Sequence, residues 1–302
     1  MNRFERVRAA LKGQEVDRVP AGFWLHYKNG GDLAVQPHLD YFRETGVDFF
    51  KVMNGTLYQL DVAIDVPGDW NRVRPTSIKA NFYQRQLDLI KRVVDGLKGE
   101  CMIMTTVFNP YHHGTHSTSE AVFDEHLRAD PKAAAQAMEA MAETDIAYIQ
   151  ACFDAGVDGI YYSVQGGEHD RFDEELYVET IKKTDLLVLN SFKDRGEFNT
   201  LHLCGANMRL DHYADYPSHA INWDVKNNAV TMKQGGEKFG RAVLGGINNR
   251  GPIVNGAKEE IVAEVKAVIE GFGRKGLLLG ADCTLPTTTP YGNVRAAVEA
   301  AY

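Results

Sequence analysis

Short apolar runs alternate with longer amphipathic segments along the chain. Eight runs have the length and composition of buried strands, and they span residues 19–27, 49–53, 102–108, 159–164, 200–203, 220–223, 242–247 and 277–279. Segments between them, such as 131–156 and 257–273, carry apolar residues at helical spacing and end in a glycine suited to a helix C-cap. This alternation predicts an α/β protein, a (β/α)8 TIM barrel forming a single domain over residues 1–302. An open doubly wound sheet is the alternative, but no G-x-G-x-x-G motif follows any run.

The composition is that of a large soluble domain. Apolar residues make up 44% of the 302 residues, which is enough for an extended core. Lys and Arg number 33 against 41 Asp and Glu, so the net charge of −8 offers no basic surface for nucleic acid. No apolar run approaches the roughly 18 residues of a membrane span, and the charged N-terminal segment lacks the apolar centre of a signal peptide. We therefore predict a cytoplasmic protein whose partners are neither nucleic acids nor membranes.

Three side chains capable of binding a metal follow the ends of predicted strands. His202 and Cys204 are two residues apart, so their side chains point to the same side of an extended chain, and Cys283 comes just after the last apolar run. One imidazole and two thiolates are a ligand set suited to zinc, and three protein ligands leave a fourth position open, as in reactive zinc sites. The other two cysteines, Cys101 and Cys152, are expected to be core residues, and four widely spaced cysteines make a disulfide framework unlikely.

Polar residues follow most of the other predicted strands as well. In a parallel barrel the active site lies at the carboxyl ends of the strands, so these residues are expected around one mouth. Asp224 and Glu168 are the candidates for a fourth, displaceable zinc ligand. His112, His113 and His116 form a tight cluster of rival metal ligands, but they are expected to form a polar loop that lines the mouth and touches substrate. The predicted substrate-binding residues are His26, Tyr27, Asn54, Tyr111, His113, Tyr162, Gln165 and Asn248.

Three phrases of the sequence resemble a known family. RFERVRAALKGQEVDRVP (3–20) and GGINNRGPIVNGAKEEI (245–261) are similar to the opening and the seventh-strand phrase of the uroporphyrinogen decarboxylase superfamily. GADCTLPTTTPYGNVRAAVEAA (280–301) is most similar to its zinc-dependent branch, the cobalamin-dependent methyltransferases that move a methyl group from a methylated corrinoid protein to a thiol such as coenzyme M. In that branch the zinc ligands are an H-x-C pair and a late cysteine, which here correspond to His202, Cys204 and Cys283.

The resemblance implies an enzyme that uses Zn²⁺ and a corrinoid carried by a partner protein to move a methyl group to a thiol. Two departures argue against porphyrinogen decarboxylation. The stretch FWLHYKNGG (23–31) has one cation, Lys28, where the decarboxylases have several arginines, and Asn54 falls about where they carry an essential aspartate. Three other functions remain open: a decarboxylase or lyase acting on a small carboxylic acid, a demethylase passing methyl from a methylated small molecule to the corrinoid, and a protein that binds a corrinoid or thiol without turnover.

Overall fold

A curled parallel sheet forms the centre of the protein. The computed structural model describes residues 1–27, 30–54 and 60–302. Within these residues, seven parallel strands pair in the order in which they occur along the chain. They are β1 (Phe49–Val52), β2 (Met102–Phe108), β3 (Gly159–Val164), β4 (Thr200–Leu203), β5 (Ala220–Trp223), β6 (Ala242–Ile247) and β7 (Leu277–Ala281). The α/β class is confirmed, and so are strands at seven of the eight predicted places.

The prediction of a strand at residues 19–27, the first of the eight along the chain, is wrong. This segment makes only isolated bridges to the β7 side, between Ala21 and Leu279 and between Leu25 and Leu285. Pro20 has no N–H to donate, and the N–H of Ala21 donates to the side chain of Asp48 at 2.9 Å instead of to a strand. The carbonyl of Ala21 accepts from the N–H of Asp48 at 2.7 Å, so the segment still lies between β7 and the start of β1. The result is a barrel-like sheet that is not fully closed.

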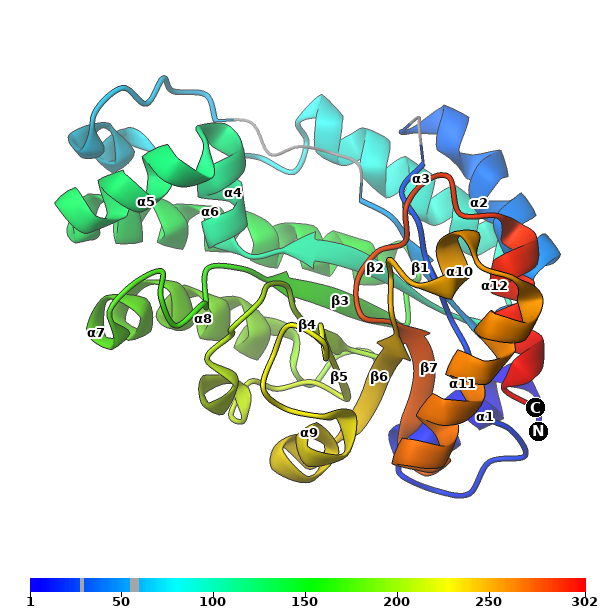
Figure 1. The fold of residues 1–302 in the computed structure, drawn as a ribbon. Coiled ribbons are helices and arrows are strands. Elements are labelled where there is room, and N and C mark those ends of the chain that lie inside the picture. The colour runs from blue at the N-terminus through cyan, green and yellow to red at the C-terminus, as the bar shows by residue number, and fades with distance from the viewer. Residues whose placement is uncertain (28–29, 55–59) are drawn as a thin grey trace.

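Helices cover the outside of the sheet, and the two termini lie close together (Figure 1). The helices predicted at 131–156 and 257–273 are confirmed as α6 and α11. No helix in the described part of the chain has both the length and the apolar character needed to cross a bilayer. The helices are α1 (Arg3–Leu11), α2 (Asp32–Thr45), α3 (Asn81–Leu97), α4 (Pro110–Ser117), α5 (Glu120–Ala129), α6 (Pro131–Asp154), α7 (Glu174–Leu176), α8 (Lys183–Phe192), α9 (Met232–Phe239), α10 (Pro252–Asn255), α11 (Lys258–Phe272) and α12 (Tyr291–Ala300).

Alternating strand residues divide the core into two parts. On β1, Phe50 and Val52 join the large cluster between the sheet and its helices, whereas Phe49 joins a smaller cluster inside the curl. The inner cluster also contains Met102, Met104, Tyr161, Ala220, Leu244 and Leu278, together with Val7 and Ala10 of α1. Because apolar side chains fill this part of the interior, the polar groups gather at the carboxyl ends of the strands, where barrel enzymes carry their sites.

Candidate metal centre

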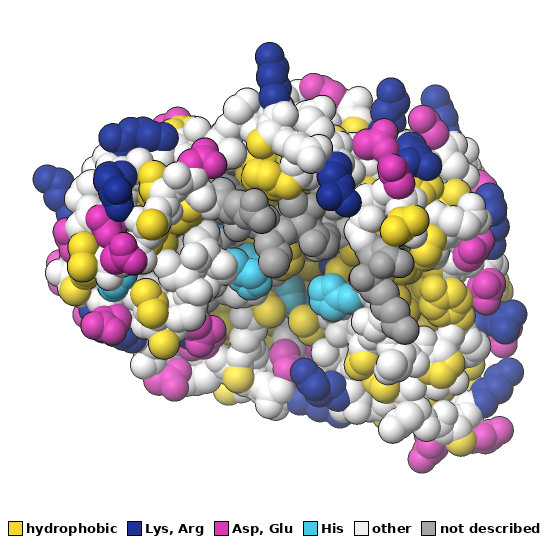
Figure 2. Space-filling model, turned by 90° about the horizontal axis from the view of Figure 1, so that it is seen from above, with side chains coloured by type: hydrophobic (Ala, Val, Ile, Leu, Met, Phe, Trp, Pro, Cys, Tyr) yellow, Lys and Arg dark blue, Asp and Glu magenta, His cyan; other side chains and the backbone are white. Residues whose placement is uncertain are grey.

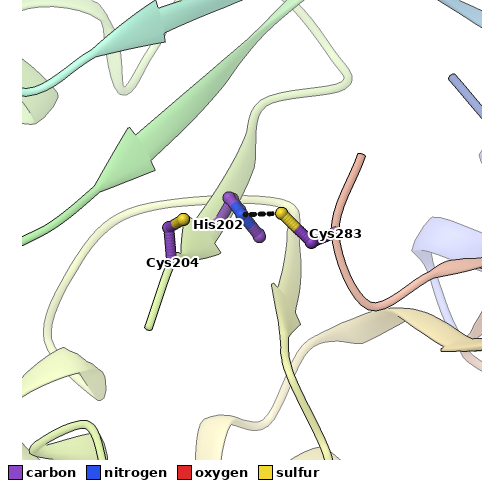
Figure 3. A group of neighbouring side chains, drawn as sticks. All are labelled: His202, Cys204 and Cys283. Atoms are coloured by element: carbon purple, nitrogen blue, oxygen red, sulfur yellow. Dashed lines mark hydrogen bonds between the residues drawn. The ribbon is translucent and has the colours of Figure 1, made fainter. Parts of the chain in front are cut away.

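His202, Cys204 and Cys283 converge at the carboxyl ends of β4 and β7. One ligand atom from each residue lies within 4.8 Å of the other two, and the three side chains point toward one another (Figure 3). The Sγ of Cys283 is 3.6 Å from the Nε2 of His202. The Nδ1 of His202 is buried and has no hydrogen-bond partner among the described residues. A compact group of one imidazole and two thiols, part of it unsatisfied, fits a thiophilic metal such as zinc.

The two thiols of this group differ in acidity. A hydrogen bond from Cys204 lowers the pKa of Cys283 well below the usual range of a thiol, and the nearby His202 acts in the same direction. The same hydrogen bond to Cys283 raises the pKa of Cys204 well above that range. Cys283 is therefore the more readily ionised of the two, and a metal ligand requires the thiolate form.

A cavity of about 750 Å³ opens beside the three residues. It lies on the face seen in Figure 2, where histidine side chains surround a hollow. Apart from the two cysteines, its titratable lining is basic or aromatic, and none of the described residues that line it is Asp or Glu. Besides His202, the basic residues of the lining are Lys51, His26, His112, His113, His116 and Arg250. A smaller chamber of about 340 Å³ is lined by the same three metal-binding candidates together with Asp224, Asn248 and Asp282.

The structure brings most of the predicted substrate-binding residues to these two spaces. Asn248 lines the smaller chamber. Lys28, the one cation of the 23–31 stretch, lies outside the described residues. The predicted residues that line the larger cavity are His26, Tyr27, Asn54, His113 and Gln165.

Two predicted tyrosines lie away from the cavity lining. The hydroxyl of Tyr111 donates to Asp124 at 2.7 Å, and that of Tyr162 donates to the buried Asp185 at 3.3 Å. Because side chains alternate along β3, Tyr161 points inside where Tyr162 points outside. The ring of Tyr161 stacks on that of His202 with centroids 5.1 Å apart, and its hydroxyl donates to Asn222 at 2.7 Å. Side chains on one face of a strand recur every second residue, and this rule, applied from the face that carries the metal-binding residues, could have identified Tyr161.

The three histidines after β2 lie on helix α4, so the prediction of a loop is wrong. Asn109 caps this helix by accepting from the N–H of His112, and Pro110 occupies its first turn. The Nε2 of His113 lies 2.9 Å from the buried carboxylate of Asp145. His112 stacks between Phe108 and His116, and burial lowers its pKa to about 3, so its ring is neutral at physiological pH. All three line the larger cavity, as expected, but from a helix.

The two carboxylates proposed as fourth ligands are engaged elsewhere. Glu168 binds Arg171 through both oxygens, at 2.8 and 3.1 Å. Asp224 accepts from the backbone N–H groups of Lys226 and Asn227, and it borders the smaller chamber. Neither belongs to the group of mutually close ligand atoms, which among the described residues consists of His202, Cys204 and Cys283.

Lys51 is a charged residue of the cavity that the sequence analysis does not identify. It lies on β1, is only 3% exposed, and has its Nζ over the rings of Trp24 at 4.6 Å and Tyr161 at 4.1 Å. Burial lowers its pKa to about 7, although the thiolates of Cys283 and Cys204 act in the opposite direction. A lysine inside an apolar run, in phase with Phe49 and Met53, is the signal that could have identified it.

Comparisons with known proteins identify the family. The model of the uroporphyrinogen decarboxylase (URO-D) family matches residues 59–302. A methyltransferase from Methanosarcina mazei has a similar structure, with a TM-score of 0.77, 20% identity, and coverage of 99% of this chain and 98% of that one.

Two further structures have similar folds at a TM-score of 0.59. One is a B12-independent methionine synthase from Shewanella sp. W3-18-1 in complex with selenomethionine (11% identity, 94% of this chain and 91% of that one). The other is a putative vitamin-B12 independent methionine synthase from Listeria monocytogenes (14% identity, 89% and 85%). No curated protein matches the sequence significantly. The family match confirms the resemblance expected from the sequence: the chain belongs to the uroporphyrinogen decarboxylase family.

Proposed function

We propose that this protein is a zinc-dependent methyltransferase that moves a methyl group between a corrinoid, carried by a partner protein, and a small thiol. The observation that carries the proposal is the convergence of His202, Cys204 and Cys283 beside a cavity. These three residues would hold the metal. Two thiolates and one imidazole leave a bound zinc ion electrically neutral and one position open. The names of the structural neighbours, a methyltransferase and two methionine synthases, agree with methyl transfer as the reaction class.

The chain supplies the surroundings that this chemistry needs. When bound, zinc supplies the capacity to convert a thiol, whose ordinary pKa is about 8.5, into a held thiolate that can attack a methyl group. Tyr161 fixes one face of His202, because its own hydroxyl is anchored on Asn222. Cys204, whose pKa is raised by its hydrogen bond to Cys283, loses its proton when both sulfurs become metal ligands. The cavity walls bring the reactants together and limit access of water.

The size of the larger cavity favours a second candidate. At about 750 Å³ it exceeds what a small thiol needs and falls within the range of sites for drug-sized ligands. A methylated small molecule would occupy such a volume better, with the methyl group passing from that molecule to the corrinoid. The same three metal ligands would serve methyl transfer to the corrinoid and from it.

Stopped-flow spectroscopy of zinc-loaded protein mixed with free methylcobalamin tests the proposal. We expect 2-mercaptoethanol to become methylated and the methylcobalamin spectrum to decay, and removal of zinc with a chelator should stop both. Methyltetrahydrofolate should be tried in parallel as the donor, because two structural neighbours are named as B12-independent. Methyl transfer that persists after zinc removal would refute a role for the metal. Methyl transfer from the folate alone, without methylcobalamin, would refute the proposal that a corrinoid carries the methyl group.

A further inference from the structure

Lys51 is a buried amine with no carboxylate partner among the described residues, and because its pKa is about 7, a nearby anion decides how fully it is charged. Its Nζ makes no hydrogen bond and no ion pair with any described residue, and it meets only the ring faces of Trp24 and Tyr161. Taking an ammonium group out of water is costly unless a counter-charge compensates it. Lys51 also lines the larger cavity, so a ligand in that cavity can reach its charge.

Two other buried cations show what compensation looks like in this protein. Arg6 and Arg18 both bind the fully buried carboxylate of Asp48, at 2.8 and 2.6 Å. Asp48 precedes β1 by one residue, and Lys51 lies within the same strand. The carboxylate therefore serves the two arginines at the amino end of β1, and nothing equivalent serves Lys51 farther along. No described Asp or Glu lines the cavity around it.

Tyr161 links Lys51 to the metal-binding group. The Nζ of Lys51 lies over the rings of Trp24 and Tyr161, and the ring of Tyr161 also stacks on His202. The sulfurs of Cys283 and Cys204 act on Lys51 through their charge. Two thiolates neutralise a divalent metal, so a third anionic ligand would leave one excess negative charge at the centre. An anion bound there favours the ammonium form of Lys51, and the charge of that ammonium balances it.

We infer that Lys51 is the counter-cation that selects an anion, namely the thiolate of the acceptor, as the fourth ligand at the His202–Cys204–Cys283 site. Lys51 acts through its charge on whatever anion is bound there and needs no direct contact with the rest of the substrate. The identity of that anion as a thiolate rests on the proposed function, whereas the preference for an anion does not. Lys51 is thus a positioning residue for the anion, and it does not increase the affinity of the site for the metal.

Binding to the cobalt(II)-substituted protein tests this role directly. Sulfur-to-cobalt charge-transfer absorption reports a thiolate on the metal, so affinity can be measured without turnover. The variants are Lys51→Met, which keeps the length and removes the charge, and Lys51→Arg, which keeps the charge. Lys91→Met, an exposed position on α3, is the matched control. The probes are 2-mercaptoethanol, cysteamine and 3-mercaptopropionate, which differ in the charge remote from sulfur, and azide, an anion without a thiol.

We expect Lys51→Met to weaken all four probes by a similar factor, about tenfold, because a unit charge close to the metal is lost in a poorly screened site. Lys51→Arg and Lys91→Met should bind them as the wild-type protein does, and cobalt affinity should not fall in Lys51→Met. Weakening confined to 3-mercaptopropionate would overturn the inference and make Lys51 a carboxylate site. Equal affinities in all proteins would overturn it too.

The azide measurement separates this inference from the proposed function. If no thiol binds the wild-type protein but azide binds about tenfold more weakly to Lys51→Met, the thiol acceptor is refuted and the counter-cation role stands. If the thiols bind wild-type and Lys51→Met equally well, the thiol acceptor stands and the counter-cation role is refuted.

Discussion

The two sides of the cavity use similar residues for different ends. On the β4–β7 side, His202, Cys204 and Cys283 point at one another and leave His202 Nδ1 without a described partner. On the β1–α4 side, histidines also gather, but they do not converge on one point: His113 lies against Asp145, and His112, whose Nδ1 also has no described partner, stacks with His116. Convergence of three ligand atoms on one point, rather than the number of histidines, therefore distinguishes a metal site from a basic wall.

Charge separates the two sides as well. The β4–β7 side holds the readily ionised thiol of Cys283, and the β1 side holds Lys51 with no described carboxylate beside it. Burying a thiolate and burying an ammonium both cost free energy, because each loses hydration. In the proposed function, the cavity therefore takes a metal cation on one side and an anion beside it.

The largest effect should come from breaking the β4–β7 side. Cys283→Ser removes one of three ligands, so we expect zinc content measured by mass spectrometry to fall from about one per chain toward zero and metal affinity to drop by at least about a hundredfold. Cys152→Ala is the control, since Cys152 is buried on α6 outside the cavity lining and should retain the metal. Equal zinc content in both variants would show that the three residues are not the ligands.

Acid should destabilise the fold around β1 by protonating His38. The Nδ1 of this buried ring lies 2.6 Å from the carbonyl of Ala34, and its Nε2 accepts from the N–H of Met53, just after β1. Burial lowers the pKa of His38 to about 4, below the 6.5 expected in the unfolded chain. The neutral ring therefore stabilises the fold above pH 6.5, and this contribution is lost as the pH falls toward 4.

We expect His38 to account for about 3 kcal/mol of the unfolding free energy lost over that interval. Urea denaturation of the metal-free protein at a series of pH values measures it, and His38→Gln, which cannot take up the proton, corrects for other groups. A difference between wild type and variant that does not change between pH 6.5 and 4 would contradict this assignment.

Lys51→Met should stabilise the metal-free protein by about 1–3 kcal/mol, because an uncompensated buried ammonium is replaced by an apolar side chain of similar length. Arg18→Met is the contrasting variant. It breaks a paired charge and leaves Asp48 with one arginine fewer, so it should destabilise the fold. Thermal unfolding of both variants gives the comparison. A loss of stability in Lys51→Met would show that its contacts with the two aromatic rings outweigh its desolvation.

The sequence predicts most of the fold because the apolar runs carry a strong local signal. Seven strands and the two helices tested follow from periodicity alone. The failure at 19–27 has a non-local cause: Asp48, far along the chain, takes the N–H that a strand would need. The error at 109–116, where a helix replaces the predicted loop, has a local cause. Asn109 followed by Pro110 is a favourable start for a helix, and Asn109 caps α4.

For the site, the sequence predicts which residue types gather but not which way each one points. His202, Cys204 and Cys283 come together because two lie in phase on one strand and the third follows a strand end. The sequence does not distinguish Tyr162 from Tyr161, because adjacent residues of a buried strand look equally apolar, and only the register with β4 tells them apart. It does not identify Lys51 either, because a strand pattern gives no account of one charged residue in an apolar run.

The smallest expected effects distinguish the two carboxylates near the metal-binding group. Asp224 borders the smaller chamber with the three metal-binding candidates, and among the described residues its carboxylate is bound by Lys226 and Asn227 of its own loop, so it could turn toward a bound metal at little cost. Glu168 is fixed by two hydrogen bonds from Arg171, and leaving them would strand a partly buried guanidinium. We therefore expect Asp224→Asn to weaken zinc binding by about threefold, since three ligands remain, and Glu168→Gln to leave it unchanged. Competition with a chromophoric chelator resolves such differences, and the reverse order would make Glu168 the resting fourth ligand and move the open position to the β3 side of the cavity.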